Sequence, residues 1–336
     1  MSRAKWLKLL FLLLGVGLLI WSIQAVDLHR VGQMLWDMGP GFLAVLAVYS
    51  VVTWLDTISW KFGFDPASAR ALPLFDLWRI RQIGESFNTI TPFGTVGGEP
   101  VKAQLLKDHH RLTFKQGLAS QVVARTTFLT ALIVFMIPGV ILLMASGSAT
   151  GPFKTISVTL LIGFSTAILL FFLFQVSGSL GRINAWLKRR IPALVDSPTL
   201  AHLDELDQLM SGYYRQHAPR FVKSIAWAFA GWVVGLGELY VTLFFLGTEV
   251  SFTDLWIIEA VSQLIRVCSF FVPLSLGVQE GGLVLIFVSM GYTADLGLAV
   301  SLVRRIKELL WVGLGLALGG GLALRPSQIE VNKAEP

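Results

Sequence analysis

Apolar residues are grouped along this chain in runs that short polar segments separate. A helix needs about 20 mainly apolar residues to cross the roughly 30 Å hydrocarbon core of a bilayer. Most of the runs reach this length, so the pattern predicts an all-α integral membrane protein with about six full transmembrane helices. The predicted spans are residues 9–23, 41–62, 118–145, 153–176, 221–246 and 294–324.

The N-terminal region, residues 1–40, combines a short first span with an amphipathic stretch. Basic residues precede the apolar run at 9–23, an order that signal peptides also show. No small-x-small cleavage site follows the run, and Trp21 stands where such a site would begin, so we favour an uncleaved first transmembrane helix. The stretch 26–38 then predicts a helix that lies in the membrane interface.

Two further segments, 74–106 and 252–290, are apolar but interrupted. Proline and glycine divide the first segment at 92–98 and the second at 273–277. Each half is too short to cross about 30 Å comfortably as a helix. Irregular backbone at membrane depth occurs only where protein buries it or where it lines a cavity. We therefore predict two re-entrant helical hairpins, and an ordinary pair of short spans in each segment is the alternative.

The two halves of the chain correspond when the sequence is shifted by 181 residues. Each half then shows the order span, broken hairpin, span, which predicts a first repeat over 41–176 and a second over 221–325. Repeats of this kind with discontinuous helices are typical of secondary transporters when the second copy is inverted. In this register Gln82, Pro92 and Glu99 fall on Gln263, Pro273 and Glu280, and Asp56 falls one position from Glu238.

Composition supports a membrane location. Of the 336 residues, 54% are apolar and only 14% are charged, whereas soluble domains carry about 25% charged residues. The mean hydropathy of +0.68 agrees. These values exclude a soluble enzyme, a disordered protein and a nucleic-acid-binding domain, despite the pI of about 9.5. The single cysteine, Cys268, excludes a disulfide framework.

The positions of Lys and Arg predict the orientation. If the N-terminus is inside and each hairpin returns to its own side, twenty of the 27 basic residues lie inside and only Arg30 and Lys154 lie outside. Basic residues gather on the cytoplasmic face. We therefore expect a cytoplasmic (inner) membrane protein with both termini in the cytoplasm, including the tail 326–336. The basic loop 177–220 with its amphipathic helix is also expected there, and the two repeats are inverted.

We single out ten of the ionisable residues within the predicted membrane segments as candidates for a functional role. Each costs about 2.5–3.5 kcal/mol on insertion scales, so such residues usually face a cavity or a partner. We expect them to surround a polar cavity; buried ion pairs that only hold the spans together are the alternative, because acids and bases are nearly balanced. The ten are Asp56, Glu85, Glu99, Arg125, Glu238, Glu259, Arg266, Glu280, Arg304 and Arg305.

The first hairpin contains the clearest candidate for ligand binding. Gly94, Gly97 and Gly98 allow close approach of the backbone, and a helix that begins near Glu99 directs free N–H groups at the break. Such a helix terminus suits a phosphate or another anion. Lys102 lies one turn after Glu99. The alternative is that these glycines serve only a tight bend.

Signals for other chemistry are missing from the sequence. No glycine loop with Gly-Lys-Ser/Thr occurs, so nothing indicates nucleotide use. His109 and His110 are adjacent and point to different helix faces, and no Ser-His-Asp order or metal-ligand spacing stands out. We therefore expect no catalytic centre, no metal site and no cofactor.

Two stretches resemble the signatures of a known family. Residues 88–102, with the sequence NTITPFGTVGGEPVK, and residues 273–280, PLSLGVQE, are similar to those of the lysylphosphatidylglycerol synthase transmembrane family, also called flippase-like membrane proteins. The resemblance runs from about Lys5 to Leu324. It implies a membrane domain that moves lipids, including aminoacylated phosphatidylglycerol, between leaflets. Leu274 and Ser275 replace the glycines usual in the second signature, which weakens an anion site at that hairpin.

Some members of that family carry an attached lipid-aminoacylating or glycosyl-transferring domain. Only about a dozen residues follow the last predicted span in this chain, so we expect no synthase domain and no enzymatic activity.

These features predict a lipid flippase that moves a phospholipid or a polyprenyl-type lipid. Its expected partners are membrane lipids with an anionic headgroup, without nucleic acid or nucleotide. The alternative is a non-transporting membrane partner that anchors a lipid-modifying or glycosyl-transferring enzyme. The predicted substrate-binding residues are Gly97, Gly98, Glu99, Lys102, Arg125, Arg266, Glu280 and Arg305, and the candidates for proton or ion coupling are Asp56, Glu85 and Glu238.

Arg266 is a special case among these residues. Its counterpart in the first repeat is Glu85, and we expect the two inverted hairpins to bring both side chains toward one central cavity. Arg266 is then either neutralised by Glu85 or left to bind a phosphate, for which its planar fork of donors is suited.

Overall fold

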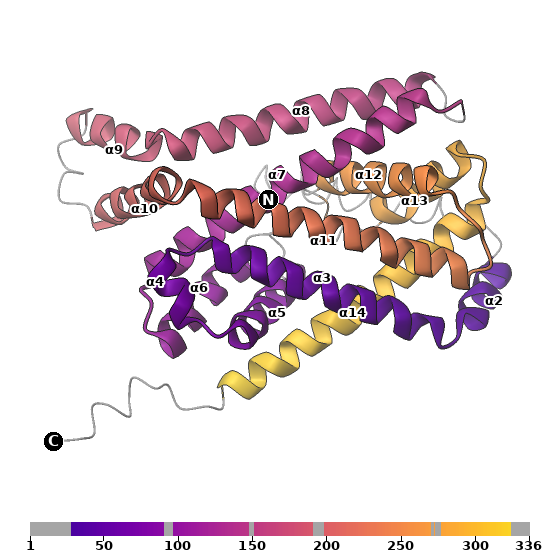
Figure 1. Cartoon of the computed structure of the whole chain (residues 1–336), viewed down its shortest axis with the longest axis horizontal. Helices are drawn as coiled ribbons and strands as arrows, with labels where there is room; N and C mark the ends of the chain where they lie inside the picture. The colour runs from indigo at the N-terminus through magenta and orange to yellow at the C-terminus, as the bar shows by residue number, and fades with distance from the viewer. Residues whose placement is uncertain are drawn as a thin grey trace, which may run out of the picture.

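The computed structural model describes residues 28–90, 97–147, 151–190, 198–269, 272 and 277–323. Within these ranges every regular element is an α-helix (Figure 1). The helices are α2 (Leu28–Met38), α3 (Gly41–Phe62), α4 (Pro66–Ala71), α5 (Leu74–Ile90), α6 (Gly98–His110), α7 (Phe114–Ala145), α8 (Gly151–Val176), α9 (Ser179–Arg190), α10 (Pro198–Gln216), α11 (Ala218–Phe245), α12 (Phe252–Cys268), α13 (Val278–Ser289) and α14 (Ala294–Ala323).

Side-chain caps determine where several of these helices begin. Thr113 and Gln116 form a capping box, so α7 begins four residues before the predicted apolar run. Asp65 accepts hydrogen bonds from the N–H groups of the first turn of α4, and Ser251 does the same for α12. The cap of α7 lies outside the apolar run, which explains why hydrophobicity alone placed the start of this helix too late, whereas the predicted start at residue 252 coincides with that of α12.

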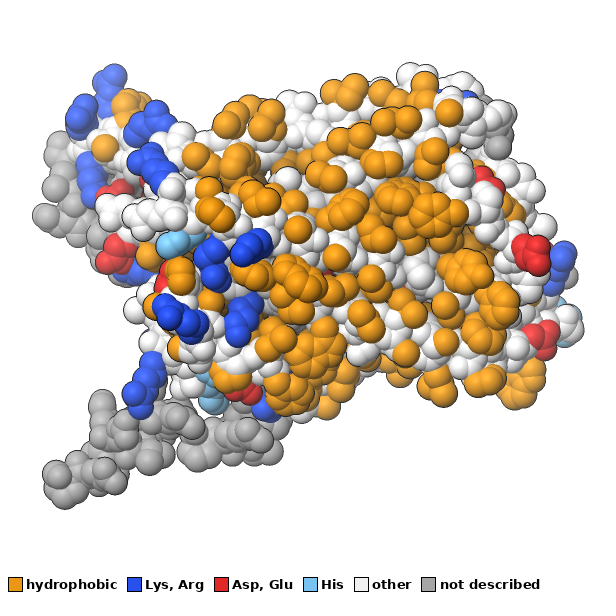
Figure 2. Space-filling model, viewed as in Figure 1, with side chains coloured by type: hydrophobic (Ala, Val, Ile, Leu, Met, Phe, Trp, Pro, Cys, Tyr) orange, Lys and Arg blue, Asp and Glu red, His pale blue; other side chains and the backbone are white. Residues whose placement is uncertain are grey.

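Four helices, α3, α7, α8 and α11, are long and apolar enough to cross a membrane. Helix α14 is 30 residues long, but Arg304, Arg305 and Lys307 interrupt its apolar stretch. The predicted first span, residues 9–23, lies outside the described residues. Figure 2 shows a broad apolar surface over the middle of the molecule. Large apolar side chains are also exposed on α8, among them Ile162 and Leu170. An exposed apolar surface of this kind is typical of a multi-pass membrane protein.

Each of the two interrupted segments consists of two helices that pack against each other. Helices α5 and α6 make up the first segment, and α12 and α13 make up the second. Helix α6 continues to His110, four residues past the predicted end. The breaks at 91–96, 270–271 and 273–276 lie outside the described residues. The loop 177–220 contains α9 as well as the expected amphipathic helix α10.

Helices of each half pack against helices of the other half. Helix α5 of the first half packs against α14 of the second, and α12 of the second half packs against α7 of the first. Helix α3 packs along α11 in the opposite direction: the Ser59 hydroxyl is bonded to Ser224 near one end, while Gly41 faces Phe245 near the other. Helices α7 and α14 also run in opposite directions (Figure 1).

The largest apolar core lies mainly between α7, α11, α12, α13 and α14. Phe135, Leu239, Ile257 and Phe287 are fully buried in it. This core is separate from the polar residues of the interior, which lie between the two halves.

Candidate functional site: a polar cavity between the two halves

A cavity of about 590 Å³ lies between the two halves of the molecule. Its wall is formed by α3, α5 and α7 from the first half and by α11, α12 and α14 from the second. A volume of this size is typical of small-molecule sites, although the many charges in the wall are unusual for the inside of a membrane domain. The charged lining residues are Asp56, Arg81, Glu85, Arg125, Glu238, Glu259, Arg266, Arg304, Arg305, Lys307 and Glu308.

Every acidic side chain of this wall is paired with a basic one. Arg81 Nη2 lies 2.6 Å from Asp56 Oδ2, and Lys307 pairs with Glu238. The two acids fall one position apart in the register of the two halves, but their bases do not correspond, because Arg81 lies on α5 and Lys307 lies on α14. The remaining pairs are Lys102–Glu85, Arg304–Glu259, Arg266–Glu308 and Arg305–Glu308. The polar cavity that we expected and the buried ion pairs that were the alternative are therefore both present.

Arg125 differs from the other basic residues of the wall. Within the described part of the chain it makes no hydrogen bond and no ion pair, whereas the other five bases of the wall all pair with an acid. Its charge acts on Glu85, but Glu85 already pairs with Lys102, so Arg125 faces the cavity without an ion pair of its own among the described residues.

Three buried N–H donors of lining residues also lack a hydrogen-bond partner. They are the side-chain amide of Gln82 and the indole nitrogens of Trp232 and Trp311. Buried donors are nearly always satisfied in proteins, so an unpaired set at one cavity indicates a missing acceptor. Together with Arg125 they make the wall suited to an anion.

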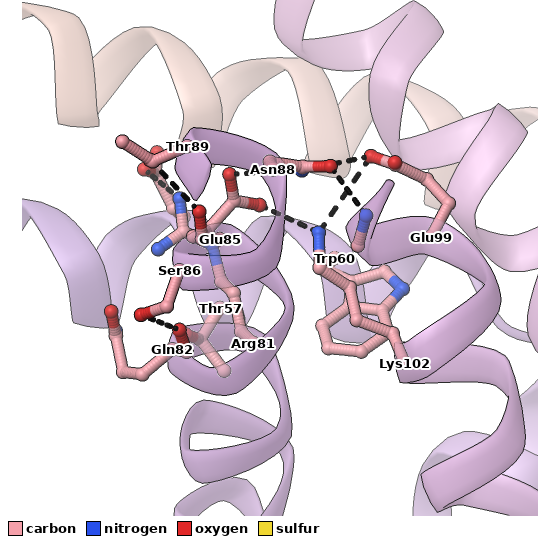
Figure 3. A network of polar contacts seen from close by, with 12 residues as sticks. Thr57, Trp60, Arg81, Gln82, Glu85, Ser86, Asn88, Thr89, Glu99 and Lys102 are labelled. Atoms are coloured by element: carbon pink, nitrogen blue, oxygen red, sulfur yellow. Dashed lines mark hydrogen bonds and ion pairs between the residues drawn. The ribbon is translucent and has the colours of Figure 1, made fainter. Parts of the chain in front are cut away.

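The first hairpin is held by a network at the open ends of α5 and α6 (Figure 3). Lys102 Nζ lies 2.6 Å from Glu85 Oε1 and 3.8 Å from Glu99 Oε1. Asn88 donates to both Glu85 and Glu99, and its Oδ1 accepts the N–H of Gly98 at 2.7 Å. The Gly98 N–H is therefore already bonded, and only the other N–H groups of this terminus remain for the anion site predicted there.

The glycine that this motif requires for steric reasons is Gly98. A Cβ added at this position would collide with the carbonyl oxygen of Gly84 on α5. The two glycines thus allow the backbones of α5 and α6 to touch, which fits the alternative that the motif glycines serve chain packing. Gly97 is the N-cap residue of α6, and Gly94 lies outside the described residues.

The second hairpin uses its matching acid differently. Glu280 accepts the N–H of Gly277 at 2.7 Å, pairs with Arg305 at 2.7 Å, and its side chain is only 4% exposed. Glu280 does not line the cavity between the two halves. Arg266 lines the cavity as expected, but its partner is Glu308 at 3.1 Å and not Glu85, which pairs with Lys102.

A smaller cavity of about 90 Å³ adjoins the main one, and we call it the side pocket. Arg125 lies in the wall of both. Sequence reasoning did not identify Gln121, although an amide within the apolar run 118–145 was a signal that could have found it. The side pocket is lined by Asp56, Ser59, Trp60, Arg81, Glu85, Glu99, Lys102, Gln121, Ala124, Arg125 and Phe128. Among the described residues no group of three His, Cys, Asp or Glu is placed to hold a metal ion.

Comparison with known proteins places the chain in a family. Residues 6–317 match the family model described as the lysylphosphatidylglycerol synthase TM region. A UPF0104 membrane protein of Methanothermobacter thermautotrophicus is 27% identical over 288 residues, which cover 80% of each chain. No solved structure matches the chain. With nearly its whole length matched, the chain belongs to the family of the lysylphosphatidylglycerol synthase transmembrane region.

Proposed function

We propose that the protein is a transporter, and not an enzyme, that moves an anionic phospholipid or polyprenyl-type lipid between the leaflets of the membrane. The observation that carries the proposal is the unpaired Arg125 in the wall of the central cavity. An arginine inside a membrane domain is costly unless it has a partner. A phosphate that enters the cavity supplies that partner and accepts two hydrogen bonds from the guanidinium.

The arrangement of the cavity supports this route. Both halves of the repeat contribute to its wall, as they do in transporters whose site lies between inverted repeats. The volume of about 590 Å³ is sufficient for a headgroup, while the acyl chains remain in the lipid. In this proposal six helices span the cytoplasmic membrane and the α5–α6 and α12–α13 pairs are re-entrant hairpins.

We place the end of the molecule that carries α4, α6 and α9 at the cytoplasm. Lys and Arg gather at this end in Figure 2, as the positive-inside rule requires. Single cysteines in a Cys268→Ser background test the orientation. A cysteine at Glu249, between α11 and α12, should react with an impermeant thiol reagent from outside in intact cells, and a cysteine at Arg215 should not. The reverse labelling would overturn the orientation.

Asp56, Glu85 and Glu238 are proposed as the coupling residues. Each is bound by a basic residue from another helix: Arg81, Lys102 and Lys307, respectively. Protonation of the acid would release that base toward the cavity, where it could bind phosphate. Ion coupling then appears as a dependence of the transport rate on an imposed pH gradient.

A flipping assay in proteoliposomes tests the function. Fluorescent phosphatidylglycerol should move between leaflets with wild-type protein and should move at least about tenfold more slowly with Arg125→Gln. Because Arg125 neutralises no acid directly, the variant should keep the melting temperature of the wild type, unlike a variant that breaks a buried pair. Arg189→Gln, at an exposed position of α9, is the matched control and should transport normally.

Two results would refute transport by this route. One is wild-type protein that moves lipid no faster than empty liposomes do, which would favour the non-transporting anchor for a lipid-modifying enzyme. The other is unchanged flipping by Arg125→Gln.

A further inference from the structure

The side pocket leads from the main cavity toward the end of the molecule that we place at the cytoplasm. Asp56 and Arg125 lie in the walls of both spaces, whereas Trp60 and Gln121 line the side pocket only. Trp60 is nearer than Asp56 to the end of α3, and Gln121 is nearer than Arg125 to the start of α7. In the proposed orientation both of these helix ends face the cytoplasm. The side pocket therefore extends inward from the main cavity.

Two buried polar atoms indicate that water occupies the side pocket. Oε2 of Glu99, an acceptor, and Nε2 of Gln121, a donor, have no hydrogen-bond partner. Gln121 is 5% exposed, and its side chain makes no hydrogen bond among the described residues. A water molecule can donate to the carboxylate and accept from the amide. The volume of about 90 Å³ has room for at least about three waters.

Three acids and three bases border this small space, so its wall carries no net charge. These residues come from α3, α5, α6 and α7, and they are Asp56, Arg81, Glu85, Glu99, Lys102 and Arg125. The Asn88 amide donates to both Glu85 and Glu99, at 3.3 Å and 3.2 Å, so one side chain links these two carboxylates. Water in the pocket links them to Asp56. Chains of acidic residues of this kind serve as proton relays in membrane transporters.

We propose that water in the side pocket forms a proton path between the cytoplasm and Asp56, with Glu99 as the first acid on it. Glu99 lines the side pocket but not the main cavity, whereas Asp56 borders both. A proton passes from water to a Glu99 oxygen and on through water to Asp56. Each transfer breaks one O–H bond and forms another, so the path needs no further reactant. This inference rests on the proposed function, because it names the proton as the ion coupled to transport.

The charge of the wall explains how the proton is coupled to an anionic lipid. One bound proton leaves the neutral wall with a net positive charge, which strengthens the binding of an anion in the adjoining main cavity. By linkage, the bound anion strengthens the binding of the proton to the same extent. A protein that crosses between its two states with both or with neither moves one anionic lipid together with one proton, and no net charge crosses the membrane.

A pH gradient across proteoliposomes tests the path. Fluorescent phosphatidylglycerol is placed in both leaflets, and its steady-state ratio between the leaflets is measured after the gradient is imposed. Because about one pH unit is a tenfold ratio of proton activities, one-to-one coupling should enrich the label by up to about tenfold in the leaflet at the higher pH. A protonophore should abolish this enrichment.

Two variants remove the path in different ways. Glu99→Gln cannot accept the proton, and Ala124→Leu fills the side pocket with apolar volume and displaces its water. Both should lose the enrichment, whereas Glu99→Asp, which keeps a carboxyl group, should retain it. The matched controls Glu249→Gln and Ala185→Leu, at exposed positions outside the pocket, should behave like the wild type. If Ala124→Leu does not fold, Gln121→Met replaces it, because Met has a similar length and removes the amide that binds the water.

The outcomes separate the path from transport itself. An even distribution of label, with wild-type protein that flips it faster than empty liposomes do, would overturn the proton path and leave the transport proposal standing. Enrichment that survives in Glu99→Gln and in a folded pocket variant would also overturn the path, as would enrichment driven by a sodium gradient at equal pH. If the wild type flips no lipid, the transport proposal fails and the coupling that rests on it fails as well.

Discussion

The repeat-related acids Glu99 and Glu280 should respond in opposite ways to the same substitution. In both cases Glu→Gln removes a negative charge and leaves the shape of the side chain unchanged. The surroundings of the two carboxylates differ, although the sequence register makes them equivalent. We therefore expect Glu280→Gln to destabilise the protein strongly and Glu99→Gln to destabilise it little.

The contacts of each carboxylate provide the magnitudes. Glu280 is 4% exposed and lies 2.7 Å from Arg305, so its loss takes the nearer of two acids from a largely buried cation and leaves Glu308 at 3.2 Å. Removing one partner of a buried ion pair costs about 3–5 kcal/mol. Because Glu308 still pairs with Arg305, we expect Glu280→Gln to cost about 3 kcal/mol. Glu99 lies 3.8 Å from Lys102, which keeps Glu85 at 2.6 Å. The loss there should be at most about 1 kcal/mol.

Thermal unfolding in detergent measures the difference. With the entropy of unfolding typical of folded chains, these costs correspond to about 4 °C for Glu280→Gln and about 1 °C for Glu99→Gln in a chain of 336 residues. A Glu280→Gln, Arg305→Met double variant should recover most of the loss, because it also removes the cation that Glu280 neutralised. Equal melting temperatures of the two single variants would refute the reasoning, and so would a double variant less stable than Glu280→Gln.

Three further predictions concern other contacts. Glu238→Gln should cost about 3–5 kcal/mol because Lys307 is left buried, and adding Lys307→Met should restore most of the melting temperature. Gly98→Ala should cost at least about 1–3 kcal/mol by overpacking, whereas Gly212→Ala, where a Cβ meets nothing within 4 Å, should be neutral or stabilising; both are compared by thermal unfolding. Although burial opposes it, hydrogen bonds from the first turn of α4 lower the pKa of Asp65 below its usual 3.8. The melting temperature of Asp65→Ala should therefore lie below that of the wild type by the equivalent of about 1 kcal/mol at pH 7, and this gap should narrow as the pH falls through the lowered pKa.

Properties that depend on local composition were predictable from the sequence. The apolar run at 41–62 coincides with α3, because the length of an apolar run is enough to predict a helix that can span the bilayer. The interruptions by proline and glycine correctly divided 74–106 and 252–290 into pairs of helices, because several of these residues close together disfavour a continuous helix. Membership of the family could also be predicted, from residues 88–102.

The partners of the charged residues were decided only by the tertiary structure. From the sequence, Glu85 and a lipid phosphate were the two candidate partners of Arg266, but Lys102 binds Glu85 and Glu308 binds Arg266. Gln121 became a candidate only when α7 was placed against α6. Ion pairs and cavities depend on which helix faces meet and at what distance, and hydrophobicity along a single chain contains no such distances. The sequence alone therefore determined which residues are expensive to bury, and the packing of the helices determined that Arg125 lacks a partner.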